Sequence, residues 1–92
     1  MSQHVEVACS PAGPGWTCEV TVGTDAAATR HRVTVDAALL ARLRPGADEP
    51  IDLVGDSVAC LLAREPREAI LREFDLPVIG RYFPEWESEI AG

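Results

Sequence analysis

The sequence predicts an α+β fold, with a three-stranded antiparallel β-meander over residues 4–35 that is covered on one face by three or four short helices. Two patterns lead to this prediction. Apolar and polar residues alternate along three successive stretches of the first third, which is the period of half-buried strands. After residue 36, apolar residues recur every three or four positions, as in amphipathic helices. A chain of 92 residues has the length of a single domain, 1–92.

The three strands are predicted over residues 4–9, 16–22 and 29–35. The second has the clearest alternation, with Trp16, Cys18, Val20 and Val22 on one face. In the third strand, His31 shares the apolar face with Val33 and Val35. Residues 10–15 hold two prolines and two glycines, so we expect a loop there. Opposite charges should face each other on the polar side of the sheet, from Glu6 and Glu19 to Arg30 and Arg32.

The helical layer and an acidic C-terminal tail are predicted over residues 36–92. Asp36 is a favourable N-cap for a first helix that ends before Pro45. A longer helix is expected over about residues 50–64, and its apolar stripe consists of Ile51, Val54, Val58, Leu61 and Leu62. Pro66 interrupts the helical pattern. Two more short helices are then expected over residues 66–73 and 76–83, followed by a final turn that contains Trp86 and Ile90.

The charge distribution argues against binding to nucleic acid. The net charge is −7, and the whole excess lies in residues 47–92, which would repel a phosphate backbone. We therefore expect no binding to nucleic acid.

No stretch is long and apolar enough to span a membrane, and residues 1–4 lack the features of an export signal. We expect a cytoplasmic protein without membrane contact. The use of arginine in place of lysine, together with many alanines, is typical of a GC-rich bacterial genome.

The cysteines and histidines offer little chemistry. An odd number of cysteines, Cys9, Cys18 and Cys60, without an export signal favours free thiols in a reducing compartment. No closely spaced pair of metal ligands and no phosphate-binding loop is present, so we expect no metal and no cofactor. The alternation permits one Cys–His pair, Cys18 with His31 on the same sheet face. A small thiol-dependent enzyme or a metal-binding module that uses this pair is the alternative function.

One segment resembles a known group of proteins. Residues 61–84 read LLAREPREAILREFDLPVIGRYFP and are similar to the C-terminal part of a group of short bacterial proteins with a pattern like REPxxxIL..FDLxVIxxYFP. No activity is attached to that group, so the resemblance brings no catalytic or binding residue. It implies a small independent protein.

The most distinctive surface feature is an aromatic cluster with acidic neighbours. Tyr82, Phe83 and Trp86 lie within five residues, next to Glu85 and Glu87. Such a cluster suits contact with a basic partner protein or with a second copy of the chain. The opposing interpretation is that the rings pack the C-terminal segment onto the core. We therefore predict a non-catalytic protein–protein interaction module, with a homodimer as one form of that interaction, rather than an enzyme.

Overall fold

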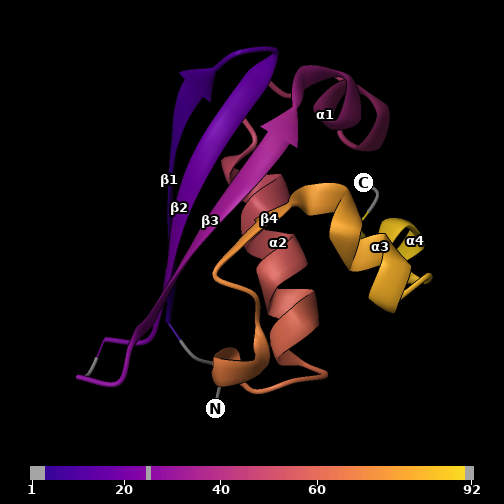
Figure 1. Cartoon of the computed structure of the whole chain (residues 1–92). Coiled ribbons are helices and arrows are strands. Elements are labelled where there is room, and N and C mark those ends of the chain that lie inside the picture. The colour runs from indigo at the N-terminus through magenta and orange to yellow at the C-terminus, as the bar shows by residue number, and fades with distance from the viewer. Residues whose placement is uncertain (1–3, 25, 91–92) are drawn as a thin grey trace.

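The computed structural model describes residues 4–24 and 26–90 and has an α+β fold (Figure 1). Three strands, β1 (Val5–Ala12), β2 (Gly15–Val22) and β3 (Thr29–Asp36), form the expected antiparallel meander. The first three residues and the predicted loop residue Asp25 lie outside the described part. Side chains alternate between buried and exposed along the strands, and Cys18, Val20 and Val22 are completely buried.

The prediction of three strands was incomplete, because a short fourth strand, β4 (Glu73–Asp75), lies parallel to β3. The sheet order is therefore β1-β2-β3-β4. Residues 66–73 were expected to be helical, but only the 3-10 turn η1 (Arg67–Ala69) forms there. The backbone becomes extended at Ile70, and the Arg32 N–H then donates to the Arg72 carbonyl at 2.6 Å. Backbone groups on the open side of β3 thus gain partners that an isolated meander would not supply.

The proline-rich segment also differs from its prediction. β1 continues through Pro11 to Ala12, and the turn occupies only the two residues before Gly15. A proline is tolerated here because β1 is an edge strand, where a missing N–H need not remove a ladder hydrogen bond. Gly15 is required for packing, since a Cβ atom at this position would overlap the Val35 carbonyl oxygen.

Helices cover the inner face of the sheet, as predicted. They are α1 (Ala37–Leu43), α2 (Ile51–Leu62), α3 (Ile79–Tyr82) and α4 (Trp86–Ile90), with the 3-10 turn η2 (Leu76–Val78) before α3. Asp36 occupies the N-cap of α1 but makes no side-chain capping bond. The buried stripe of α2 is rotated from its prediction, because Ile51 is 37% exposed. The residues that α2 buries are Leu53, Val54, Ser57, Val58 and Leu61.

Candidate functional site: an apolar groove between α2, β4 and α3

The predicted aromatic cluster is split between the core and the surface. Trp86 is completely buried, whereas Tyr82 is 66% exposed and Phe83 is half-buried. The Trp86 Nε1–H donates to the Ser57 hydroxyl at 3.0 Å, and that hydroxyl donates to the Leu53 carbonyl at 2.8 Å. A buried indole N–H needs such a partner. Trp86 therefore anchors α4. This ring packs the C-terminal segment onto the core and is not available for contact with a partner.

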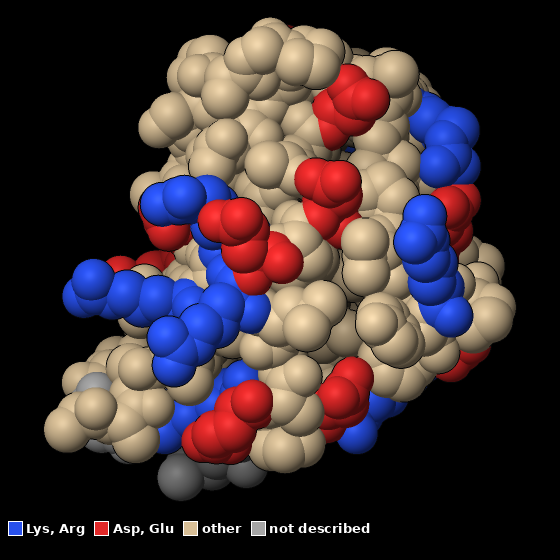
Figure 2. All heavy atoms as spheres, viewed as in Figure 1, with Lys and Arg blue, Asp and Glu red and all other residues tan. Residues whose placement is uncertain are grey.

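The acidic residues of the predicted interaction surface have partners within the chain. Glu87 accepts a hydrogen bond from Arg42 on α1 at 2.6 Å, and this contact lowers the pKa of the Glu87 carboxyl. Glu85 lies 3.4 Å from Arg64, which also pairs with Glu89 at 2.6 Å. Acidic and basic side chains are interspersed over the face in Figure 2 rather than gathered in one acidic patch. These carboxylates therefore help to hold α4 against the rest of the protein.

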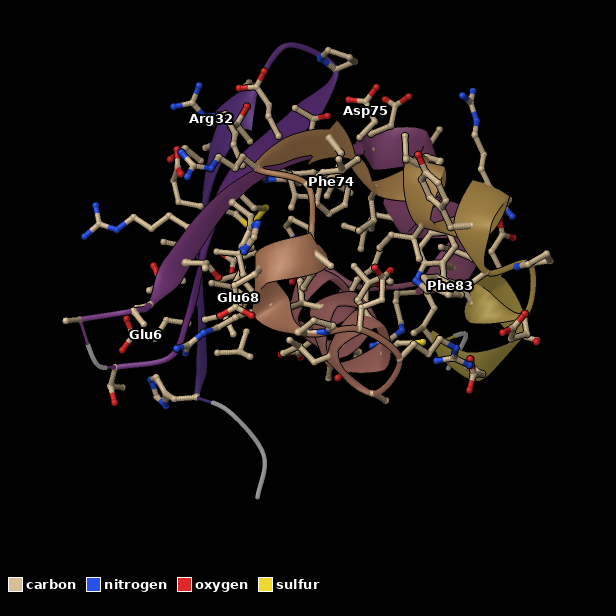
Figure 3. All side chains as sticks on the ribbon, turned by 60° about the horizontal axis from the view of Figure 1, so that its bottom comes forward. Glu6, Arg32, Glu68, Phe74, Asp75 and Phe83 are labelled. Carbon is tan, nitrogen blue, oxygen red and sulfur yellow. A yellow bond between two sulfur atoms is a disulfide. The ribbon has the colours of Figure 1, made fainter. Side chains whose placement is uncertain are left out.

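Tyr82 and Phe83 instead form part of an apolar groove with a volume of about 190 Å³. Phe74 of β4 and Phe83 at the end of α3 approach it from different elements (Figure 3). Leu71, 50% exposed, belongs to the segment between η1 and β4. The complete lining consists of Leu61, Glu65, Ala69, Ile70, Leu71, Phe74, Val78, Ile79, Tyr82 and Phe83. The backbone is extended at Ile70 and in β4, whereas a helix was expected over residues 66–73, and Leu71 and Phe74 line the groove from this part of the chain.

Two charged groups flank the apolar lining. Glu65, in the turn that follows α2, is the only acidic lining residue, and it makes no ion pair within the described part of the chain. Arg64 lies over the Phe83 ring with its guanidinium carbon 5.5 Å from the ring centre. This geometry allows a cation–π attraction that fixes the ring at the groove wall. The groove thus combines aromatic walls with one uncompensated carboxylate.

Cys60 lies beside Arg64 and Glu89 and is poorly suited to act as a nucleophile. Its sulfur lies 2.9 Å from the Arg64 guanidinium and 3.5 Å from a Glu89 carboxylate oxygen. Burial raises the pKa of the Cys60 thiol, the hydrogen bond to Glu89 raises it further, and Arg64 opposes both effects. The thiol form is therefore favoured at neutral pH, whereas nucleophilic attack requires the thiolate.

The predicted pair Cys18 and His31 has a different arrangement from the one that catalysis would need. Cys18 faces Cys9 across β1 and β2 and forms a disulfide with it, visible as the yellow bond in Figure 3. The expectation of free thiols was wrong for these two residues, and while the disulfide is intact Cys18 has no thiolate. His31 is 3% exposed and lies opposite Val20.

Both ring nitrogens of His31 are engaged in structural hydrogen bonds. Nδ1 donates to the Leu71 carbonyl at 2.8 Å, and Nε2 is hydrogen-bonded to the Thr29 hydroxyl at 2.9 Å. The carbonyl can only accept, which places a ring proton on Nδ1. His31 therefore connects β3 to the segment that leads into β4, and it helps to position Leu71 at the groove.

Two further features are absent from the described part of the chain, a cluster of metal ligands and a membrane-spanning helix. Within residues 4–24 and 26–90, no group of three or more His, Cys, Asp or Glu side chains is placed to hold a metal ion. Within the same residues, no helix has the length and apolar character that a membrane crossing requires.

Comparison with protein-family models, curated proteins and solved structures finds no match for this chain. The resemblance of residues 61–84 to a group of bacterial proteins therefore stays a prediction.

Several groove residues were missed by the sequence analysis. Leu71 was expected among the apolar residues of a helix over residues 66–73, and Phe74, which follows that helix, was given no role. A possible signal was Glu73-Phe74-Asp75, a short alternation of charged and aromatic residues. Three residues are too few for a period-two pattern to be recognised. Ser57 was also missed, although a hydroxyl within an apolar stripe indicates a buried hydrogen-bond partner.

Proposed function

We propose that this protein is a non-catalytic interaction module, whose groove between α2, β4 and α3 binds an apolar side chain of a partner protein next to a basic one. One observation carries the proposal. In the described part of the chain, the exposed large hydrophobic side chains are Ile51, Leu71 and Tyr82, and two of these three line the same groove. Exposed apolar side chains that occur singly need no explanation, whereas their gathering at one concave site indicates a contact surface.

The size of the groove favours a side chain over a metabolite. Its volume of about 190 Å³ lies below the range of roughly 300–1,000 Å³ that is typical of small-molecule pockets. A single leucine or aromatic side chain would fill most of it. Interfaces of this kind depend on a few buried anchors that enter such pockets.

The charge of the groove favours a basic partner segment. Glu65 supplies a carboxylate beside the apolar lining, and the net charge of the chain is −7. A lysine or arginine next to the apolar anchor would pair with Glu65, and the overall field would speed association with a basic partner. We expect no nucleic-acid partner for the same reason.

The compartment in which this interaction takes place is a separate proposal. The cytoplasmic location was predicted from residues 1–4 and from the lack of an apolar span, and free thiols were expected as its consequence. The Cys9–Cys18 disulfide conflicts with that consequence, since disulfides persist mainly in oxidising compartments. The groove itself does not depend on the compartment.

Selection from a library of random peptides tests the proposal. We expect the selected peptides to share a leucine or aromatic residue next to lysine or arginine. Leu71→Ala and Tyr82→Ala should each weaken binding of a selected peptide about 5- to 30-fold, the effect of removing an interface contact worth about 1–2 kcal/mol. Glu65→Gln should remove the preference for the basic residue and reduce the salt dependence of binding.

Ile51→Ala is the matched control, because it removes the third exposed hydrophobic side chain, which lies outside the groove. Its binding of the selected peptides should equal that of the wild type. The proposal fails if no peptide binds in a manner that Leu71 or Tyr82 affects, or if Ile51→Ala weakens binding as strongly as the groove variants do.

A further inference from the structure

The strand β1 has an open edge on the side of the sheet away from β4. Which backbone groups face that edge follows from one hydrogen bond, in which the Gly23 N–H donates to the His4 carbonyl at 2.7 Å. Alternate residues of an antiparallel strand bond to the same neighbour, so the even-numbered residues of β1 face β2. The odd-numbered residues Val5, Val7 and Cys9 therefore direct their N–H and C=O groups outward.

Two further observations agree with this assignment. Cys9 and Cys18 have Cα atoms only 4.0 Å apart, as expected for the closely spaced, non-hydrogen-bonded type of pair. Pro11 is also odd-numbered, so its missing N–H falls on the open edge and removes no bond to β2. Within the described part of the chain, no hydrogen bond reaches the outward N–H and C=O groups of Val5, Val7 and Cys9.

We propose that this edge is a homodimer interface, in which β1 of two copies pair antiparallel about a two-fold axis at Val7. In this register Val7 of one copy faces Val7 of the other. Val5 of each copy faces Cys9 of the other copy. Each facing pair forms two hydrogen bonds. All the outward N–H and C=O groups of these three residues then gain partners.

The two neighbouring registers are less favourable. A shift that centres the axis on Glu6 places two carboxylates directly opposite each other, which is destabilising. A shift that centres it on Ala8 places Val5 opposite Pro11, which has no N–H to offer the Val5 carbonyl. The axis at Val7 avoids both problems, and it places Glu6 opposite Ala8.

The neighbouring flank of α2 supports the same arrangement. Gly55 lies above Val7, since a Cβ atom at Gly55 would be 3.9 Å from a Val7 methyl group. On this flank α2 carries no charge, and its residues are Ile51, Gly55, Ala59 and Leu62. A two-fold axis at Val7 brings Gly55 of one copy towards Gly55 of the other. Small residues at that point allow the two helices to approach closely.

Sedimentation equilibrium with the full chain tests the proposal. We expect the wild type to have twice the monomer mass of 9.9 kDa. Gly55→Glu should weaken dimerisation by at least about tenfold, because it places two carboxylates at the contact between the helices. The monomer should tolerate this change, since the nearest atom to the new Cβ is 3.9 Å away and Gly is a poor helix former. Ala41→Glu, at an exposed position on α1, is the matched control and should remain dimeric.

Amide hydrogen exchange identifies the edge directly. In the wild-type dimer the amides of Val5, Val7 and Cys9 should be protected, and in Gly55→Glu they should exchange rapidly while those of Glu6 and Ala8 stay protected. A wild type that is monomeric at concentrations up to about 1 mM, where an association worth only about 4 kcal/mol would be detected, overturns the proposal. The proposal is also overturned if Gly55→Glu leaves the protein dimeric and the amides of Val5, Val7 and Cys9 are unprotected in that dimer. The groove variant Tyr82→Ala should not change the mass, which separates this proposal from the proposed function.

Discussion

In the meander of β1, β2 and β3, each strand pairs with the next strand along the chain, whereas residues 63–90 are held by contacts with distant parts of the sequence. The Trp86 indole bonds to Ser57, 29 positions away, and Arg42 pairs with Glu87 across 45 positions. The Arg44 guanidinium donates to the Ile90 carbonyl across 46 positions. The meander thus depends on a repeated pattern, while the C-terminal segment depends on individual anchors.

This difference predicts how much of the fold a destabilising substitution should affect. A buried charge within the meander should disrupt the layer on which every helix packs. Loss of an anchor in residues 63–90 should loosen the groove and α4 but leave the paired strands in place. The following predictions test this contrast, from the largest expected effect to the smallest.

Val20→Asp should abolish folding, because Val20 is completely buried and an unpaired carboxylate there has no compensating partner. Circular dichroism during urea titration should show no cooperative transition. Thr21→Asp, one position along the same strand, is the control and should cost less than about 1 kcal/mol. Equal effects of the two substitutions would contradict the assignment of faces in β2.

Trp86→Ala should lower the free energy of unfolding by about 3–5 kcal/mol, because it leaves a large cavity and removes the donor to Ser57. Tyr82→Ala should change it by no more than about 0.5 kcal/mol, since this ring is mostly exposed. Urea denaturation of both variants measures the contrast. Similar losses would mean that Tyr82 is part of the core and would also weaken the case for the groove.

Glu87→Gln should have the smallest effect and should depend on pH. The pKa of Glu87 is lowered in the folded protein by Arg42, so the stabilisation is fully present above the ordinary pKa of 4.5. It is lost as the pH falls through the lower pKa of the folded state. Glu87→Gln should therefore be slightly less stable than the wild type near neutral pH and equal to it in strong acid. A difference that grows on acidification would contradict the sign of this shift.

The sequence was sufficient for the parts of the fold that repeat a pattern. The alternation through Cys18, Val20 and Val22 predicted the inner face of β2, and the spacing of apolar residues predicted α2 within two residues at each end. The parallel strand β4 could not be predicted, because it is three residues long and exists only through its pairing with β3. Local propensity carries no information about such a distant partner.

The candidate site was predicted only in part, for a related reason. The composition of the aromatic segment showed that it matters, but it could not show which rings face the core. Trp86 can be completely buried because Ser57 on α2 accepts the hydrogen bond of its indole N–H, whereas Tyr82 at the end of α3 is 66% exposed. The groove depends on Leu71 and Phe74, whose positions follow from β4. An error about one short strand therefore became an error about the site.

The place of β4 in the sheet has a consequence for the order of folding. His31 and Leu71, which meet beside this strand, are separated by 40 positions, and closing this loop costs more chain entropy than closing either hairpin. The β1–β2 and β2–β3 hairpins close far shorter loops and should form early. We therefore expect a late kinetic phase in which residues 70–90 dock, so that the groove is completed only after the rest of the sheet has assembled.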